Sequence, residues 1–200
     1  MKRADLKIGG FVPFSTTDYP DHLSAVVFCQ GCPWRCGYCH NPHLQPPTGT
    51  STLCWHDILS FLETRRGLLD AVVFSGGEPT MQRALANAMR AVKALGFKVG
   101  LHTAGIYPQR LPAILALIDW VGLDLKAPFD CYERVTRVPR SGARARKSAE
   151  HVVASGVDHE FRTTVDRSLL GEEDIARLSA EIPGMGATRY VLQTCRGVPV

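Results

Sequence analysis

The sequence has no apolar run long enough to span a membrane, and residues 1–7 lack the apolar stretch that a secretory signal requires. It contains no internal repeat, low-complexity tract or domain linker. Its 200 residues can bury one substantial core but fall short of eight complete βα units. We therefore expect a cytosolic protein with a single domain over residues 1–200.

Acidic residues are missing from one stretch, residues 134–147, although the net charge of the whole chain is only +4. The cations of this stretch are Arg134, Arg137, Arg140, Arg144, Arg146 and Lys147. It has no interleaved aromatic residues and no recognised nucleic-acid motif, which argues against nucleic-acid binding. Such a run is either a solvated loop face or a surface that meets an acidic partner, so it is a candidate docking surface.

Disulfides are not expected, because the seven cysteines are odd in number, clustered and without a secretory signal. The three isolated cysteines, which are typical of small buried residues, are Cys54, Cys131 and Cys195. The others lie together: Cys32, Cys36 and Cys39 are spaced C-x3-C-x2-C, and Cys29 precedes them. Crowded thiolates in a short loop that contains Gly and Pro predict an iron or zinc site.

The number of cysteines limits the metal chemistry. No second C-x2-C pair follows the loop, although a structural zinc site usually combines two pairs. Three cysteines on a four-iron cluster would leave one iron open to a small molecule. Zinc remains an alternative, bound by all four clustered cysteines or by three of them with His40. We interpret Cys29 as the buried end of a preceding strand.

Short apolar runs alternate with amphipathic segments along the chain. Strands are predicted at residues 25–28, 71–74, 97–101, 120–125, 160–165 and 189–193. Helices are predicted at residues 55–62, 81–95, 108–117, 146–155 and 172–181. The segment from residue 11 to the first strand is interpreted as a turn-rich lead-in. This alternation requires parallel βαβ units, so the fold class is α/β, either an open doubly wound sheet or a partial barrel.

Polar residues follow each predicted strand, where ligands bind in parallel α/β folds. Each of the six predicted strands is followed by one such segment. In chain order these are the cysteine loop at 29–42, residues 75–79, 102–105, 124–126 and 162–164, and Gln193. In the second of these, Gly76 and Gly77 would let a ligand approach the main chain, and Glu78 offers a carboxylate to a cationic amine. All six ends are expected to face one mouth.

The cysteine loop, with the aromatic Tyr38 before its last cysteine, resembles the cluster loop of the radical S-adenosylmethionine (SAM) enzymes. The segment SGGEP is similar to the segment with which those enzymes bind SAM. Across nearly the whole chain, the DYP lead-in, the YCHNP continuation, the DLK segment and the ending RYVLQ resemble the activating proteins of anaerobic ribonucleoside-triphosphate reductases. This resemblance to the glycyl-radical-enzyme activases implies a partial (β/α)6 TIM-like barrel of the radical SAM type.

The resemblance also implies a site. The ligands of a [4Fe–4S] cluster whose fourth iron is open to SAM would be Cys32, Cys36 and Cys39. The residues that bind SAM would be Tyr38, His40, Gly76, Gly77, Glu78, His102, Thr103, Asp124, Lys126, Arg162 and Gln193. Among them, the Gly-Gly-Glu turn would meet the amino group of SAM, and the lysine of the DLK segment would lie near its carboxylate.

The chain departs from its relatives at residues 101–105, which read Leu-His-Thr-Ala-Gly where many related activases read Asp-Thr-Asn-Gly. In that group the aspartate of the DLK segment helps an adjacent cation site. With His102 in place of an aspartate and Gly122 nearby, the presence of an alkali cation is an open question. The imidazole could hydrogen-bond SAM or could be structural.

The function implied by the resemblance is that of an activase. Reduced by a flavodoxin- or ferredoxin-like donor, the cluster would pass one electron to SAM, and the resulting 5′-deoxyadenosyl radical would take a hydrogen atom from a glycine of a partner reductase. The cofactors carry this chemistry, so no side chain need act as an acid or base. Two alternatives remain: a radical SAM enzyme on a small molecule, similar to the 7-carboxy-7-deazaguanine synthases, and a non-catalytic zinc- or cluster-binding interaction module.

Overall fold

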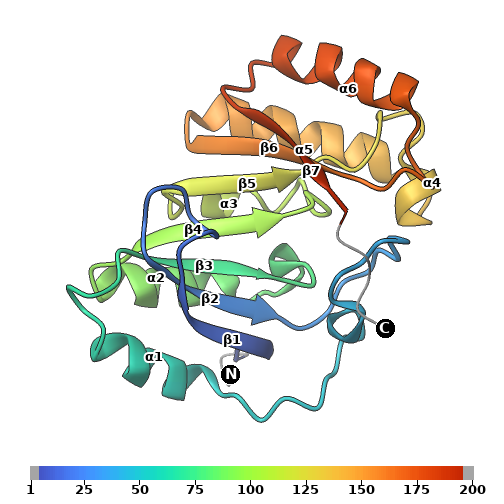
Figure 1. Cartoon of the computed structure of the whole chain (residues 1–200). Helices are drawn as coiled ribbons and strands as arrows, with labels where there is room; N and C mark the ends of the chain where they lie inside the picture. The colour runs from blue at the N-terminus through green and yellow to red at the C-terminus, as the bar shows by residue number, and fades with distance from the viewer. Residues whose placement is uncertain (1–4, 196–200) are drawn as a thin grey trace.

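Six parallel strands form the centre of the molecule, paired in the order in which they occur in the chain (Figure 1). They are β2 (Ser24–Cys29), β3 (Ala71–Gly76), β4 (Lys98–Thr103), β5 (Trp120–Asp124), β6 (Asp158–Val165) and β7 (Tyr190–Thr194). These strands belong to a computed structural model that describes residues 5–195. All six predicted strands are present, and the predicted α/β partial barrel is confirmed.

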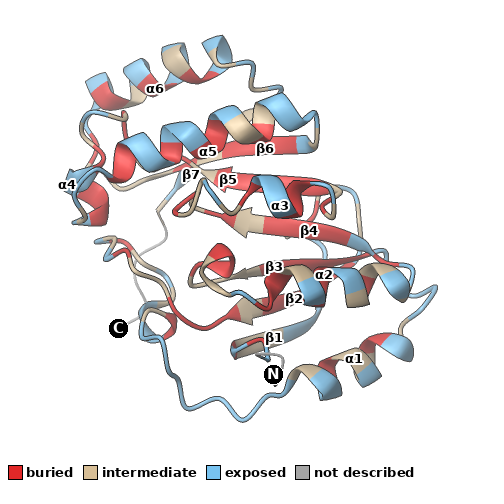
Figure 2. Cartoon of the chain, turned by 180° about the vertical axis from the view of Figure 1, so that it is seen from behind, coloured by how far each residue is buried: buried red, intermediate tan, exposed pale blue. Residues whose placement is uncertain are grey.

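The connecting helices cover one face of this sheet, as the view from behind shows (Figure 2). They are α1 (Trp55–Glu63), α2 (Leu85–Ala94), α3 (Pro112–Leu115), α5 (Ser141–Ser155) and α6 (Glu172–Gly184), with a short additional helix, α4 (Glu133–Thr136). Each longer helix buries an apolar stripe; α1, for example, buries Ile58 and Leu62, four residues apart. No helix of the described residues is long and apolar enough to cross a membrane.

The opposite face of the sheet encloses a small second core. Its members are Tyr19, Val26, Ala71, Val73 and Trp120. Tyr19 enters this core from the turn that precedes β2, and its ring lies 5.4 Å from that of Trp120. A β-carbon at Gly100 would lie only 3.0 Å from the Tyr19 ring, so the glycine makes room for it. The turn therefore fills the inside of the partial barrel below the strand ends.

The prediction of a turn-rich lead-in from residue 11 was wrong in its first part. Ile8–Ser15 forms an eight-residue strand, β1, which pairs antiparallel with β2 at the edge of the sheet. Its two glycines and Pro13 argued against a strand in the sequence. An edge strand tolerates proline, because one side of its backbone needs no ladder partner, and the register here is irregular in two places.

Three predicted helices begin elsewhere than expected. The helix predicted at residues 108–117 is the four-residue α3, which begins at Pro112. The helix predicted to start at Met81 begins at Leu85, because Arg110 donates to the carbonyls of Thr80 and Met81 and holds a separate 3-10 turn there. The helix predicted to start at Arg146 begins five residues earlier, at Ser141. The basic stretch is therefore mostly helical, in α4 and the first half of α5.

Candidate active site

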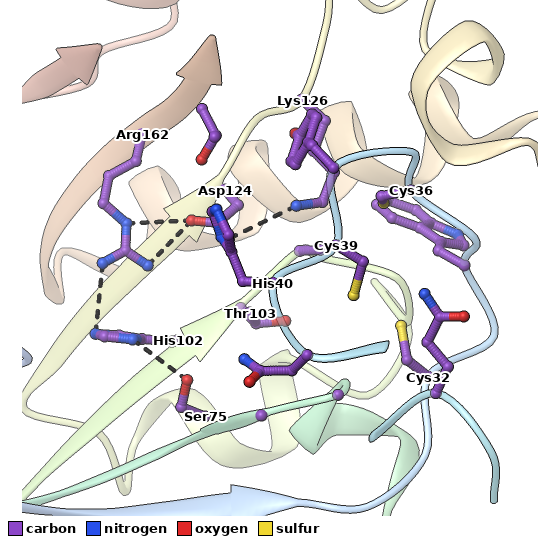
Figure 3. A pocket seen from close by; sticks show the side chains of 18 residues that line it. Cys32, Cys36, Cys39, His40, Ser75, His102, Thr103, Asp124, Lys126 and Arg162 are labelled. Atoms are coloured by element: carbon purple, nitrogen blue, oxygen red, sulfur yellow. Dashed lines mark hydrogen bonds and ion pairs between the residues drawn. The ribbon is translucent and has the colours of Figure 1, made fainter. Parts of the chain in front are cut away.

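A cavity of about 190 Å³ lies at the carboxyl ends of the parallel strands (Figure 3). Its wall joins the three motif cysteines and His40 to polar residues from four strand ends. These polar residues include Ser75, His102, Asp124, Lys126 and Arg162. Gln193 at the end of β7 lines a neighbouring, wider depression of about 800 Å³ that shares His102, Asp124 and Arg162 with the cavity. Five of the six strand ends thus meet at one cavity.

The cysteine loop leaves β2 and is fixed by main-chain hydrogen bonds. Cys32 N–H donates to the Gln45 carbonyl over 2.9 Å, and Arg35 N–H donates to the Thr136 carbonyl over 3.0 Å. The Arg35 guanidinium closes the loop by donating to the Cys32 carbonyl over 2.7 Å. The three motif cysteines consequently line the cavity half-buried, whereas Cys29 is fully buried at the end of β2.

These thiols are poor ligands until something displaces their protons. Burial, and secondarily the Glu78 carboxylate, raises the pKa of Cys32 to about 12. Burial likewise raises the pKa of Cys36 above its usual value, although Lys126 opposes this. Binding a metal or cluster would therefore release protons from the loop.

Two buried polar atoms in the cavity wall test whether an iron–sulfur cluster fits. Trp34 Nε1 and Tyr38 Oη have no hydrogen-bond partner among the described residues, although Trp34 is 1% and Tyr38 4% exposed. Buried donors without acceptors are rare, and cluster sulfur would be an acceptor. Within residues 5–195 no three His, Cys, Asp or Glu side chains are grouped to hold a single metal ion. The two unpartnered donors fit a cluster whose sulfur atoms would face this wall.

The Gly-Gly turn after β3 is packed against the start of the cysteine loop. Gly76 has φ +109°, and a β-carbon there would lie 2.5 Å from the main-chain nitrogen of Cys29. A β-carbon at Gly77 would lie 2.5 Å from the carbonyl oxygen of Gly31. We expected these glycines to admit a ligand, but the closest constraint on both is the backbone of the neighbouring loop. They therefore also set the position of the cysteines.

Glu78 does not offer a free carboxylate to the cavity. It is fully buried, is not part of the cavity wall, and accepts four hydrogen bonds. Its donors are the main chain and hydroxyl of Thr80, the Thr103 hydroxyl and the Ala104 main chain. Burial raises its pKa, and these hydrogen bonds oppose the rise. In this structure the carboxylate ties the turn after β3 to the end of β4.

A charged group occupies the other side of the cavity. Arg162 Nη2 lies 3.0 Å from Asp124 Oδ1, and Lys126 Nζ lies 3.7 Å from Asp124 Oδ2 (Figure 3). Burial alone would raise the pKa of Asp124, but Arg162 and Lys126 hold it below its usual value. Two cations against one carboxylate leave this wall with a net positive charge. An anionic group such as a ligand carboxylate would be stabilised here.

His102 lies next to this group in surroundings that favour its neutral form. Its Nε2 lies 2.8 Å from the Asp18 carbonyl, which can only accept, and 3.4 Å from Arg162 Nη1, which can only donate; Nδ1 faces the Ser75 hydroxyl at 3.5 Å. The shorter of the two contacts favours a proton on Nε2. Burial, and then the nearby Arg162, lowers the pKa of His102 to about 4. The DYP turn thereby contacts a residue of the cavity wall, and no local pattern predicts this contact.

Several cavity residues were not among the predicted site residues. They are Trp34, Asn41, Gln45, Ser75, Ala104 and Thr164. Trp34 and Asn41 lie in the cysteine loop, and Ser75 lies in the SGGEP segment. Their positions in these motifs could therefore have predicted that they line the cavity. Gln45 lies beyond the motif, and only the hydrogen bond from Cys32 to its carbonyl brings it to the cavity.

Residues 26–179 match the family model of the radical SAM superfamily. The chain belongs to this superfamily. Radical SAM enzymes use a [4Fe–4S] cluster and SAM, which agrees with the three motif cysteines that line the cavity.

Sequence relatives place the chain in the glycyl-radical-enzyme activase group. A Methanocaldococcus jannaschii protein, whose name provisionally describes it as a glycyl-radical enzyme activating enzyme, is 33% identical over 184 residues, covering 88% of this chain and 75% of its own length. The pyruvate formate-lyase 1-activating enzyme of Escherichia coli K12 is 32% identical over 132 residues, covering 62% of this chain and 53% of its own. The chain thus spans only about half the length of the latter relative.

Solved structures support the fold. Streptococcus suis SuiB bound to S-adenosylmethionine superposes with a TM-score of 0.68 at 18% identity, over 84% of this chain and 39% of SuiB. The enzyme anSMEcpe with bound AdoMet gives a TM-score of 0.62 at 17% identity, over 84% of this chain and 50% of its own. At such identities the likeness concerns the fold alone.

Proposed function

We propose that this radical SAM protein activates an anaerobic ribonucleoside-triphosphate reductase by generating a glycyl radical on it. One observation carries the proposal: three cysteines of one loop face the Asp124, Lys126 and Arg162 group across a single cavity. When bound, the cluster and SAM would supply the reductively formed 5′-deoxyadenosyl radical that takes a hydrogen atom from a glycine α-carbon. The residues of the chain hold these groups and exclude water from them.

Each part of the cavity suits a part of this assembly. Cys32, Cys36 and Cys39 would hold the cluster. The positive wall formed by Lys126 and Arg162 would hold the SAM carboxylate, and main-chain atoms of the Gly-Gly turn, rather than the Glu78 carboxylate, would face its amino group. Thr103 would fix that turn through its hydrogen bond to Glu78. Tyr38, His40 and His102 line the same space and would contact the remainder of SAM.

A protein substrate fits the surroundings of this cavity. The wider depression beside it, which includes Thr17, Gln193 and Thr194, would admit a glycine-bearing loop. The choice of a ribonucleoside-triphosphate reductase rests on the DYP, YCHNP and RYVLQ segments of the sequence. The free cysteines of the described residues suit a reducing cytoplasm, where we expect the protein to work with a flavodoxin- or ferredoxin-like donor.

The proposal is tested anaerobically in two steps. The protein is reconstituted with iron and sulfide, reduced, and given SAM, and 5′-deoxyadenosine is measured with Cys36→Ala as the control. The reductase is then added, and the glycyl radical is recorded by electron paramagnetic resonance. Product from the parent alone, followed by a glycyl radical, is the expected result.

Other outcomes would identify the alternatives. Zinc in place of iron and sulfide, without SAM cleavage, would indicate a passive interaction module. The protein could instead cleave SAM and turn over a small molecule, such as a deazaguanine precursor, without forming a radical on the reductase. That result would indicate a radical SAM enzyme that acts on a small molecule. Either result would overturn the proposed function.

A further inference from the structure

Part of the basic stretch forms an exposed patch beside the cysteine loop. We define the basic patch as Arg35, Arg137, Arg140 and Arg144, all exposed and without an ion pair among the described residues. The other cations of the stretch are paired, Arg134 with Asp174, Arg146 with Glu181 and Lys147 with Glu150. The basic patch therefore carries positive charge that is not neutralised within the described chain.

The basic patch is joined to the outer side of the cysteine loop. Arg35 belongs to the loop, and its main-chain N–H donates to the Thr136 carbonyl at the end of α4 over 3.0 Å. Figure 1 and Figure 2 both show α4 next to this loop. The guanidinium of Arg35 also donates to the carbonyl of Cys32. A partner that touches the basic patch thus touches the segment that carries the cysteines.

Gly37 is an exposed point of the cysteine loop beside the basic patch. It lies between Cys36 and Cys39 in the sequence and has no side chain of its own to cover the loop. A β-carbon there would lie 3.2 Å from a methyl carbon of Leu169 and 3.9 Å from a guanidinium nitrogen of Arg137, so Leu169 and the basic patch both border it. A partner on the basic patch would therefore lie next to the segment that carries Cys36 and Cys39.

This side of the loop is distinct from the side on which SAM would be bound. Neither Gly37 nor any member of the basic patch lines the cavity or the wider depression. A glycine that reacts with a radical formed in the cavity must approach through those openings. The basic patch is therefore badly placed to deliver a glycine but well placed to deliver an electron from outside.

Two arginines of the basic patch lie in backbone conformations that do not favour them. Arg137 and Arg140 both adopt left-handed conformations, with φ of 58° and 61°, which glycine or asparagine would adopt with less strain. Backbone geometry therefore does not explain why arginine is present at these two positions. The Glu133 carboxylate accepts a 2.6 Å hydrogen bond from the main-chain N–H of Arg140 at the N-terminus of α5, and within the described chain it forms no ion pair with a guanidinium group of the basic patch.

From these relationships we infer that the basic patch docks an acidic one-electron carrier protein against the outer wall of the cysteine loop. The inference rests on the proposed function, because it presumes a cluster that must be reduced. One electron leaves the reduced flavin or iron–sulfur centre of the carrier and enters the oxidised [4Fe–4S] cluster, and no bond to the carrier is made or broken. Complementary charge would accelerate the encounter and make it dependent on salt.

The test compares two reductants on the reconstituted protein. Reduction of the cluster is followed by the loss of its visible absorbance, either with reduced flavodoxin or with photoreduced 5-deazaflavin, a small molecule that needs no docking. The variants are Arg140→Glu with Arg144→Glu, the charge-conserving pair Arg140→Lys with Arg144→Lys, and Arg90→Glu on α2 as a matched exposed control. Circular dichroism confirms that each variant is folded.

The double Glu variant is expected to be reduced by flavodoxin about tenfold more slowly at low salt, and the difference should shrink at high salt. Reduction by deazaflavin should not change, and the Lys pair and Arg90→Glu should behave as the parent. Unchanged reduction by flavodoxin in the double Glu variant, or an equal loss in Arg90→Glu, would overturn the inference.

The same variants also test whether the basic patch binds the reductase instead of the carrier. They distinguish a failure of this inference from a failure of the proposed function. If the double Glu variant, reduced by deazaflavin, forms less glycyl radical on the reductase than the parent does, the basic patch binds the reductase and the inference is overturned. If the parent itself never cleaves SAM after reduction by deazaflavin, the proposed function fails, whereas the flavodoxin rates still decide whether the basic patch docks the carrier.

Discussion

The hydroxyl of Thr103 donates a 2.7 Å hydrogen bond to the carboxylate of Glu78, and both side chains are buried. This bond joins the turn after β3 to the end of β4. Because the same turn packs on the start of the cysteine loop, the position of the Gly-Gly main chain relative to the three motif cysteines depends on this bond. Glu78 is thus a positioning residue in this structure.

Replacing Glu78 by Gln should destabilise the protein by about 2–3 kcal/mol, because an amide NH2 would face donors that now meet carboxylate oxygens. Affinity for SAM should fall with it, since the turn loses its anchor. Urea unfolding and equilibrium dialysis of SAM measure the two effects. Glu150→Gln, at an exposed position of α5, is the control. Unchanged stability in Glu78→Gln would show that the network is not structural.

Replacing Gly122 by Ala should separate Arg162 from Asp124. A β-carbon at position 122 would lie 2.8 Å from the Arg162 guanidinium carbon, so the flexible arginine must move. We expect about 1 kcal/mol lower stability and about tenfold weaker SAM binding, because the positive wall loses its alignment. Gly184→Ala, where nothing lies within 4 Å of the added carbon, should leave both unchanged. Equal SAM affinity in the two variants would argue against a role for Arg162.

The cluster should depend on Cys36 but not on Cys29. Cys36→Ala removes a cavity-lining thiol, whereas Cys29→Ala removes a thiol that is fully buried outside the cavity. After anaerobic reconstitution we expect about four iron atoms per chain in Cys29→Ala, as in the parent, and far fewer in Cys36→Ala. Cys29→Ala should still cost about 1–2 kcal/mol of stability through the lost packing. Loss of iron in Cys29→Ala would return the four-cysteine zinc site to consideration.

His102 should make the free energy of unfolding depend on pH. Its folded pKa of about 4 lies below the ordinary value of 6.5, so the unfolded chain binds more protons between these values. The contribution of His102 to the free energy of unfolding is fully present above pH 6.5 and is lost as the pH falls toward 4. Because the ring is partly exposed and water screens it, we expect on the order of 2 kcal/mol.

Urea unfolding of the parent and of His102→Asn between pH 7.5 and pH 4.5 measures this contribution. The parent should lose more stability than the variant over that interval. Parallel curves for the two proteins would mean that the imidazole is not held neutral by its surroundings. An NMR titration of the His102 ring would give the folded pKa directly.

Much of the fold could be predicted, because parallel strands buried on both faces are continuous apolar runs and the helices between them are amphipathic. All six parallel strands were predicted from this signal. The edge strand β1 was missed because its glycines and Pro13 argue against a strand. They are tolerated here because β1 pairs with a neighbouring strand on one side only. The start of α2 was misplaced for a similar reason: Arg110, distant in sequence, holds the carbonyls before it.

Local patterns in the sequence were enough to identify the segments that come to the mouth of the barrel, because strand ends follow from apolar periodicity and the cysteine spacing is local too. What each side chain does at the mouth depends on tertiary contacts. Glu78 turns away from the cavity because Thr80, Thr103 and Ala104 donors, supplied by two turns, satisfy it. Arg162 reaches Asp124 because Gly122 leaves the space, and Arg137 borders Gly37 because α4 packs on the loop. Such contacts depend on close approach between segments far apart in the chain, which no local pattern records.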